Sequence, residues 1–338
     1  MARHMNRLML WPLFTLPLLG LGGNSLAQDM YPEKIAELAT VKVTPRPEGP
    51  LLWRAQKGEA TLWFLVIPRS TPRNEAINLD RAYQVARTAN SFISSPRIST
   101  SFEGNPFKLF GTYMKVRSSQ RNPGGKLLSE VLNSKDYNEW SALASRYSVD
   151  TKELERLRPY FASHKLHAAA LKSHGMMSTS FIWKNLQEIA RKDRKNVIFP
   201  KADIYLDNPT QSIKRFAGAE MNDGPCFRAV LKEIAQLPNA EIVQAQAWAA
   251  GDIDGMTRIA ASENRRMECE SISIALADDS NLNGKHLDEM RRQAWLSSLS
   301  QAISNGPIAF GILPIELALG QDGYLATLEN SGYKVTVQ

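Results

Sequence analysis

The stretch L-W-F-L-V-I-P-R-S-T-P, from Leu62 to Pro72, sets the expectation for the whole fold. Its first six residues are all apolar and rich in branched and aromatic side chains, which is typical of a buried strand. The strand runs directly into a loop that begins at Pro68. Because strand ends often carry binding and catalytic residues in α/β folds, we expect a functional site at this point.

Further patterns flank this strand on both sides. A second strand is expected at 51–55, and Lys57-Gly58-Glu59 suits a hairpin turn between the two. Apolar spacing predicts helices at 75–89, through most of 127–191, and at 213–237, 240–250, 263–276 and 286–304. Additional strands are expected at 92–93, 107–116, 196–199, 308–313 and 333–337. Strands at both ends of the chain therefore enclose a helical middle, which predicts one sheet with a helical insertion at about 127–191.

The N-terminus has the composition of a secretory signal peptide. Arg3 and Arg7 precede the apolar segment 8–22, and Ser25-Leu26-Ala27 offers small residues where a signal peptidase reads the chain. We predict cleavage after Ala27, and hence a periplasmic or secreted protein. An uncleaved membrane anchor is the alternative, but the apolar segment is short for a membrane span and is interrupted by proline.

The signal peptide, residues 1–27, is followed by a proline-rich stretch at 28–50, which we expect to form an N-terminal arm. Residues 51–338 are expected to form a single domain. No later segment is long and apolar enough to cross a membrane. The net charge of +7 is scattered along the chain, and no recognition motif accompanies it, so we expect no nucleic-acid partner.

The chain contains two cysteines, Cys226 and Cys269. In an oxidising compartment such a pair is expected to form a disulfide, with two buried free thiols as the alternative. Neither cysteine belongs to a C-x-x-C pair or lies beside a histidine in the sequence, which disfavours a redox or nucleophilic role.

A search for catalytic motifs finds no G-x-S-x-G, H-E-x-x-H, Walker or G-x-G-x-x-G pattern. His164, His167 and His174 would share one helical face, and three imidazoles there could bind zinc or copper. However, no acidic residue lies between them and two lysines are close by. We therefore interpret them as surface or packing histidines and expect no metal.

Four other residues have plainer interpretations. Asp252 and Asp254, in G-D-I-D-G, are expected to serve as a helix N-cap rather than to bind calcium. Trp248 and Trp295 fall in helical apolar patterns and are expected in the core.

Five segments match one family pattern in the same order along the chain: 51–65, Leu157–Phe161, Ala247–Asp252, Arg291–Trp295 and 307–335. On these segments the chain resembles the TraB/GumN family, which includes the Tiki metalloproteases. The resemblance implies an α/β domain with a central, mostly parallel sheet and a helical cap. It also implies that the two histidine motifs of the family meet at the strand ends.

The family's metal-binding positions are occupied here by other residue types. Its two Gly-x-x-His motifs end on Arg69 and Leu317, and its glutamate falls on Ser95. A divalent metal needs imidazole or carboxylate donors, whereas arginine only donates hydrogen bonds and leucine has no donor atom. Val66 and Pro314 also replace the motif glycines. The resemblance therefore implies a divergent member with a vacated metal site, and we expect no cofactor.

These departures favour a non-catalytic protein with a binding or accessory role in the cell envelope. Arg69 and the retained Arg291 are candidates to bind an anionic group or a peptide C-terminus, with Glu316 as a third binding candidate. The partner would then be an envelope protein, a peptide or an anionic ligand; alternatively, Arg69 points into solvent. A hydrolase rebuilt around Glu316 and Ser95 is the competing hypothesis. An accessory role in exopolysaccharide production is suggested by family lineage alone.

Overall fold

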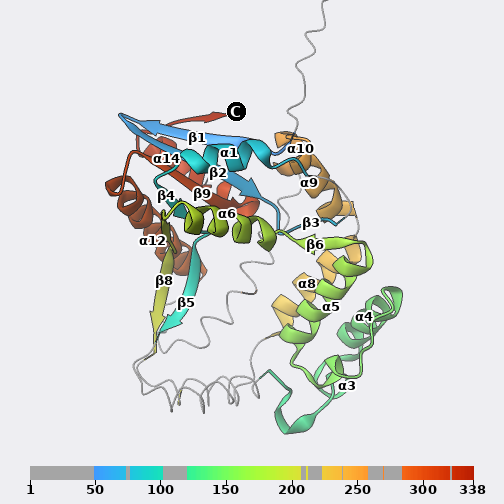
Figure 1. Cartoon of the computed structure of the whole chain (residues 1–338). Coiled ribbons are helices and arrows are strands. Elements are labelled where there is room, and N and C mark those ends of the chain that lie inside the picture. Colours follow the sequence, from blue (N-terminus) through green and yellow to red (C-terminus); the bar gives the residue numbers. More distant parts are fainter. Residues whose placement is uncertain are drawn as a thin grey trace, which may run out of the picture. The chain divides into compact units, whose positions relative to one another are not determined.

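A six-stranded sheet organises the computed structural model, in the order β10-β1-β2-β9-β4-β7 (Figure 1). β2, β9, β4 and β7 pair in parallel, whereas β1 is antiparallel to both β2 and β10. The mostly parallel α/β sheet built from both ends of the chain is thus confirmed. In chain order the strands are β1 Leu52–Lys57, β2 Ala60–Ile67, β4 Ser91–Ile93, β7 Asn196–Ile198, β9 Ile308–Pro314 and β10 Lys334–Val337.

The structure describes residues 49–73, 77–101, 120–206, 211, 223–237, 239–257, 269, 284–319 and 322–338. These residues belong to one unit, Pro45–Gln338. The predicted signal peptide and nearly all of the N-terminal arm lie outside the described residues. So do the strand expected at 107–116 and, apart from residue 269, the helix expected at 263–276.

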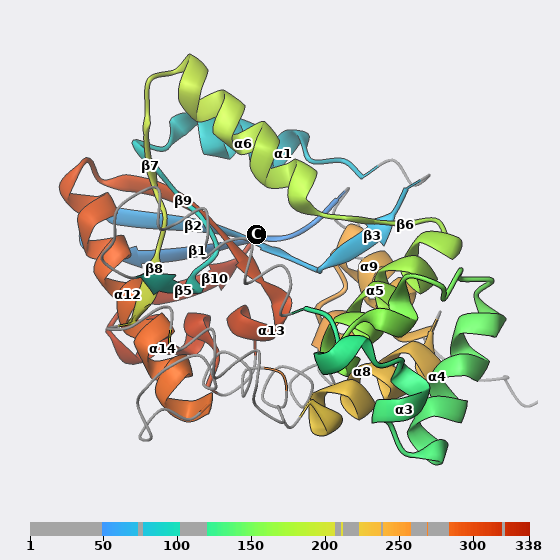
Figure 2. The ribbon, with the colours of Figure 1, turned by 90° about the horizontal axis from the view of Figure 1, so that it is seen from below.

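Helices cover both faces of the sheet (Figure 2). α1 (Asp80–Thr88) and α6 (Ser180–Lys192) lie on one face, and α12 (Gly284–Ser304) and α14 (Tyr324–Asn330) lie on the other. From the α12 side, Trp295 packs its ring 5.7 Å from Phe64 of β2. Because β2 is covered on both faces, its side chains from Phe64 to Ile67 are all buried, which explains the continuous apolar run.

A second apolar core lies in the helical cap. It is formed by α3 (Leu128–Val131), α4 (Ser134–Arg146), α5 (Pro159–Ser173) and α8 (Gly224–Gln236), with Trp140, Leu166 and Phe227 among its buried residues. The disulfide between Cys226 and Cys269 lies in this core, as predicted. Of the segment 127–191, α3 to α5 belong to this cap, whereas α6 packs on the sheet.

α9 (Asn239–Ala249) and α10 (Ile253–Thr257) join the cap to the sheet. Trp248 of α9 is fully buried in the sheet core and donates a hydrogen bond from Nε1 to the carbonyl oxygen of Val66, at 2.6 Å. Asp252 accepts from the backbone N–H of Gly255 and so caps α10, as expected. Both tryptophans expected in the core, Trp248 and Trp295, are therefore confirmed.

Two of the described pairings were not expected from the sequence. β3 (Ser70–Pro72) pairs with β6 (Met176–Ser178), and β5 (Arg97–Ser101) and β8 (Lys201–Tyr205) form a separate parallel pair. The residues of β8 alternate between exposed and buried, with Ala202 and Ile204 inward. Among the helices that the structure describes, none is long and apolar enough to cross a membrane.

Replacing Trp248 with phenylalanine should destabilise the fold, because it removes the donor that ties α9 to the end of β2. We expect a loss of about 1–3 kcal/mol in the free energy of unfolding, measured by urea denaturation. Trp183→Phe is the matched control, since that side chain is only partly buried and no hydrogen bond of its indole is among the described contacts. Equal losses in the two variants would contradict the role assigned to the Trp248 hydrogen bond.

Candidate functional site

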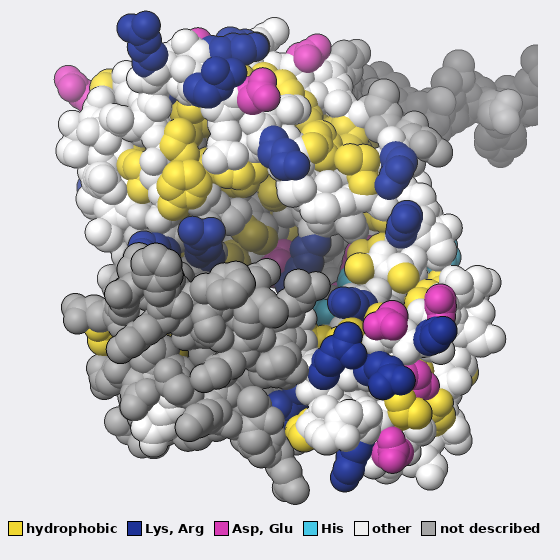
Figure 3. Space-filling view, turned by 60° about the horizontal axis from the view of Figure 1, so that its bottom comes forward, with side chains coloured by type: hydrophobic (Ala, Val, Ile, Leu, Met, Phe, Trp, Pro, Cys, Tyr) yellow, Lys and Arg dark blue, Asp and Glu magenta, His cyan; other side chains and the backbone are white. Residues whose placement is uncertain are grey.

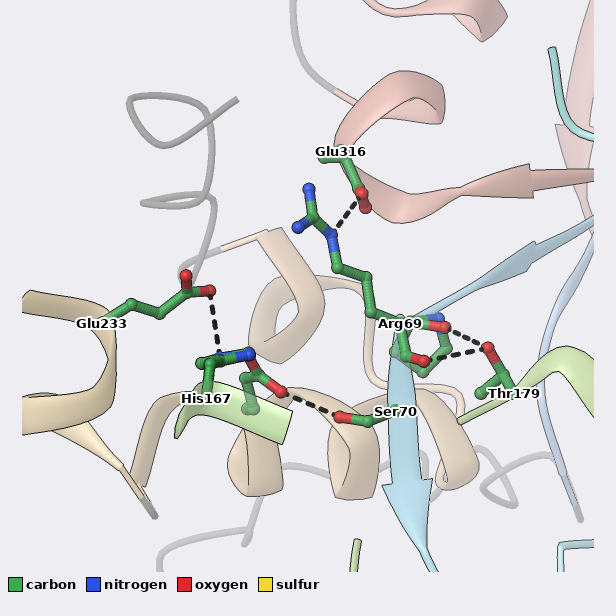
Figure 4. A network of polar contacts seen from close by, with 8 residues as sticks. Arg69, Ser70, His167, Thr179, Glu233 and Glu316 are labelled. Carbon is green, nitrogen blue, oxygen red and sulfur yellow. Dashed lines mark hydrogen bonds and ion pairs between the residues drawn. The ribbon is translucent and has the colours of Figure 1, made fainter. Parts of the chain in front are cut away.

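The loop after β2 is fixed by contacts from the cap side. The strand that follows this loop, β3 (Ser70–Pro72), pairs with β6 (Met176–Ser178) of the cap side. Thr179 then donates from Oγ1 to the carbonyl oxygen of Pro68 at 2.6 Å and from its backbone N–H to that of Arg69 at 3.2 Å (Figure 4). The backbone of Arg69 is therefore held in place, and its side chain extends from a rigid support.

The two segments that the resemblance aligns with the family's histidine motifs meet at the sheet edge. β2 and β9 pair in register up to Ile67 and Pro314, so the residues that follow each strand are neighbours. Arg69 donates from Nε to Oε1 of Glu316, on the short helix α13 (Ile315–Ala318), at 2.7 Å (Figure 4). The neighbouring Leu317 is buried in the apolar core instead.

Ser95 also lies at this edge, where it donates from Oγ to the carbonyl oxygen of Ile312 in β9 at 3.4 Å. The three positions Arg69, Ser95 and Leu317 do not fit the metal that the resemblance implies. A guanidinium has no lone pair to offer, the leucine side chain has no polar atom, and the serine hydroxyl is bonded to the backbone.

A second polar cluster lies beside Arg69 and comes from three helices of the cap region. His167 of α5 places Nε2 at 3.0 Å from Oε1 of Glu241 in α9 and at 4.0 Å from Oε1 of Glu233 in α8. Ser70, next to Arg69 in the chain, donates to Oε2 of Glu241 at 2.8 Å. The surface view shows acidic, basic and histidine side chains close together in a hollow on this face (Figure 3).

The two glutamates have opposite pKa shifts. Burial raises the pKa of Glu233 to about 7, with the negative charge of Glu241 adding to the effect and His167 opposing it. Burial also acts to raise the pKa of Glu241, but hydrogen bonds from His167 and Ser70 outweigh it and the net pKa is lowered. Glu241 is thus held as a carboxylate next to a carboxyl group whose pKa is raised to about 7, a pairing common at functional sites.

Arg69 links this cluster to the sheet edge. Burial acts to lower the pKa of Arg69, but the carboxylates of Glu316, Glu233 and Glu241 outweigh burial, and the net pKa is raised above its ordinary value. Its side chain is 37% exposed, so the guanidinium faces both the carboxylates and the solvent.

Of the three histidines expected on one helical face, His167 alone joins the acidic pair. His164 stacks on Tyr160, with ring centroids 4.3 Å apart, and bonds the Tyr160 carbonyl oxygen through Nδ1 at 2.9 Å. His174 lies at the C-terminal end of α5 and contacts the ring of Tyr147. Within the described residues, the three imidazoles therefore do not form one metal site.

Arg291 retains the family residue type but is not an open basic group. It is 6% exposed within α12 and pairs through Nη1 with Asp288 at 2.9 Å. Its charge is used within its own helix.

The sequence interpretation missed Glu233 and Glu241, because they lie far along the chain from His167. A signal was nevertheless present. Glu233 interrupts the apolar stripe formed by Cys226 and Val230 of α8 and by Leu237, which caps that helix. Glu241 precedes Ala245 and Trp248 on the buried side of α9. A charged residue within an apolar helical stripe indicates a buried partner in another element.

The sequence model of the TraB/PrgY/gumN family matches residues 108–337. This range includes the His167 cluster and Glu316, and it begins after Arg69 and Ser95. None of the curated proteins and none of the solved structures compared matches the chain significantly.

The stability of the cap should depend on pH through His164. Burial lowers its pKa below the ordinary 6.5, and the positive charges of His167 and Arg69 add to this, against the hydrogen bond that Nδ1 makes to the carbonyl oxygen of Tyr160. The unfolded chain therefore binds this proton more readily, and the free energy of unfolding should fall as the pH drops below about 6.5.

His164→Gln should lose less stability between pH 7 and pH 5 than the unchanged protein, as measured by urea denaturation at each pH. Lys165→Gln, an exposed position on the same helix, is the control and should keep the original pH dependence. Identical slopes for His164→Gln and the unchanged protein would contradict the prediction.

Proposed function

The chain belongs to the TraB/PrgY/gumN family, and we propose that it is an exported, non-catalytic binding protein whose family metal-hydrolase site is no longer in use. One observation carries this proposal, the ion pair between Arg69 and Glu316 at 2.7 Å. It joins the two strand ends where the resemblance would place metal-binding histidines. A fixed guanidinium at that point repels a metal cation and offers it no ligand atom.

The charges around Arg69 favour a cationic ligand over the anionic group expected from the sequence. Three carboxylates, those of Glu316, Glu233 and Glu241, act on one guanidinium. Arg291 adds no open positive charge, because it is buried and paired with Asp288. The excess of acidic groups attracts a positively charged ligand, such as an amine or a metal ion.

The proposed location is the periplasm or the exterior of the cell. The basic n-region, the apolar segment and the small residues before Gln28 support export. The disulfide between Cys226 and Cys269 agrees with an oxidising compartment. An accessory role in the envelope follows from this location, and a link to exopolysaccharide production rests on lineage alone.

The competing hydrolase hypothesis loses support at Glu316 and Ser95. Glu316 is bonded to Arg69, and Ser95 to the carbonyl oxygen of Ile312. Among the described contacts, no hydrogen bond joins these two side chains as a nucleophile and its base would require. A hydrolase in this fold would instead use the carboxyl pair of Glu233 and Glu241, whose pKa values are moved apart.

The non-catalytic proposal predicts that the purified, exported protein does not cleave peptides, with or without added Zn²⁺ or Mn²⁺. The measurement is release of fluorophore from a mixed quenched-peptide library. Cleavage that disappears in both Glu233→Gln and Glu241→Gln, but persists in the exposed-site control Glu329→Gln, would overturn the proposal.

The cationic-ligand proposal predicts a charge preference in binding. Two fluorescent peptides that differ only in carrying lysines or glutamates should bind with different affinities, and the lysine peptide should bind more tightly. Glu316→Gln should reduce this preference by about tenfold, since about 1.4 kcal/mol of interaction corresponds to that factor. The measurement is fluorescence anisotropy at low salt, and Glu329→Gln is again the control. Tighter binding of the glutamate peptide would contradict the proposal.

A further inference from the structure

The cluster of His167, Glu233 and Glu241 has the geometry of a metal site. Each residue contributes one ligand-type atom, and these atoms all lie within 4.8 Å of one another. They come from α5, α8 and α9, so three rigid elements converge on one point. A site carried by helices keeps its ligands in place better than a site carried by loops.

The cluster is largely shielded from solvent. The side chains of His167, Glu233 and Glu241 are 10%, 18% and 13% exposed. Burying two carboxyl groups together is costly unless positive charge compensates them. Arg69 supplies one positive charge, but its Nε is bonded to a third carboxylate, Glu316. With the three carboxyl groups and Arg69 charged and His167 neutral, as a metal-binding imidazole must be, two negative charges remain, which is the charge that a divalent cation neutralises.

The orientation of Glu241 is set by a second group. Ser70 donates to Oε2, which leaves Oε1 directed at His167. Such a hydrogen bond to the outer oxygen of a metal-binding carboxylate is typical of supporting residues in metal sites. Ser70 and His167, both labelled in the close-up view, thus contact different oxygens of the same carboxylate (Figure 4).

We propose that His167, Glu233 and Glu241 bind a divalent transition-metal ion, of which Zn²⁺ is the best match. One imidazole nitrogen and two carboxylate oxygens suit Zn²⁺ better than Ca²⁺ or Mg²⁺, which are bound by oxygen atoms alone. The three side chains leave the fourth tetrahedral position open to an external ligand. This inference deepens the proposed function. It rests on the proposal that the site binds a cationic ligand, and it identifies that ligand as a divalent metal ion.

The binding test uses the whole chain, exported, purified and stripped with EDTA. Calorimetric titration with Zn²⁺ should give one ion per chain. His167→Ala and Glu241→Gln should each weaken binding by more than roughly 100-fold, because loss of a supporting hydrogen bond alone typically costs 10- to 100-fold. Ser70→Ala should fall within that smaller range.

His174→Ala and Glu188→Gln are the matched controls, a histidine on the same helix and an exposed glutamate, and both should bind Zn²⁺ as the unchanged protein does. A thermal measurement keeps the test valid if a variant folds poorly. Saturating Zn²⁺ should raise the melting temperature of the unchanged protein, and EDTA should reverse the shift. The near-isosteric Glu233→Gln should fold as before and lose most of the shift.

Absence of stoichiometric Zn²⁺, or equal weakening by His174→Ala, would overturn the metal site. In the first case the non-catalytic proposal stands, since it needs no metal. Zn²⁺ binding without peptide cleavage supports both proposals. Zn²⁺ binding with metal-dependent cleavage supports the site and contradicts the non-catalytic proposal, so the two proposals fail separately.

Discussion

The parallel pairing of β2 with β9 is the constraint on which the site depends. Its register, which ends with Ile67 beside Pro314, brings residues 69 and 316 together although they are 247 positions apart in the chain. The ion pair between Arg69 and Glu316 follows from that register. A shift by one residue would turn the side chains of β2 to the opposite face of the sheet and would separate the pair.

The second requirement is compensation of buried charge. Glu233 and Glu241 lie on helices whose neighbouring residues pack in apolar cores, and there an ionised carboxyl group must find a partner. His167 of α5, Ser70 of β3 and Arg69 of the loop before β3 supply those partners. The cap and the sheet edge are therefore joined by polar contacts as well as by the buried indole of Trp248.

Much of the fold could be predicted because its signals are local. The hairpin of β1 and β2 was readable from two apolar runs around Gly58, whose positive φ of 57° suits a turn. The disulfide followed from an even pair of cysteines.

The pairing of β5 with β8 was missed, because about a hundred residues separate the strands and β8 is only five residues long. The expectation for Arg291 as an open basic group overlooked its position on the buried side of α12.

The sequence by itself determined the α/β class, and it predicted a divergence from the family at Arg69, Ser95 and Leu317 and a histidine on a cap helix. These follow from residue types and from periodicities of two and of about 3.6, which need no knowledge of distant contacts. Only the tertiary structure decided that Glu316 pairs with Arg69, and that His167 meets Glu233 and Glu241. Those meetings depend on strand register and helix packing, and both are properties of the folded chain as a whole.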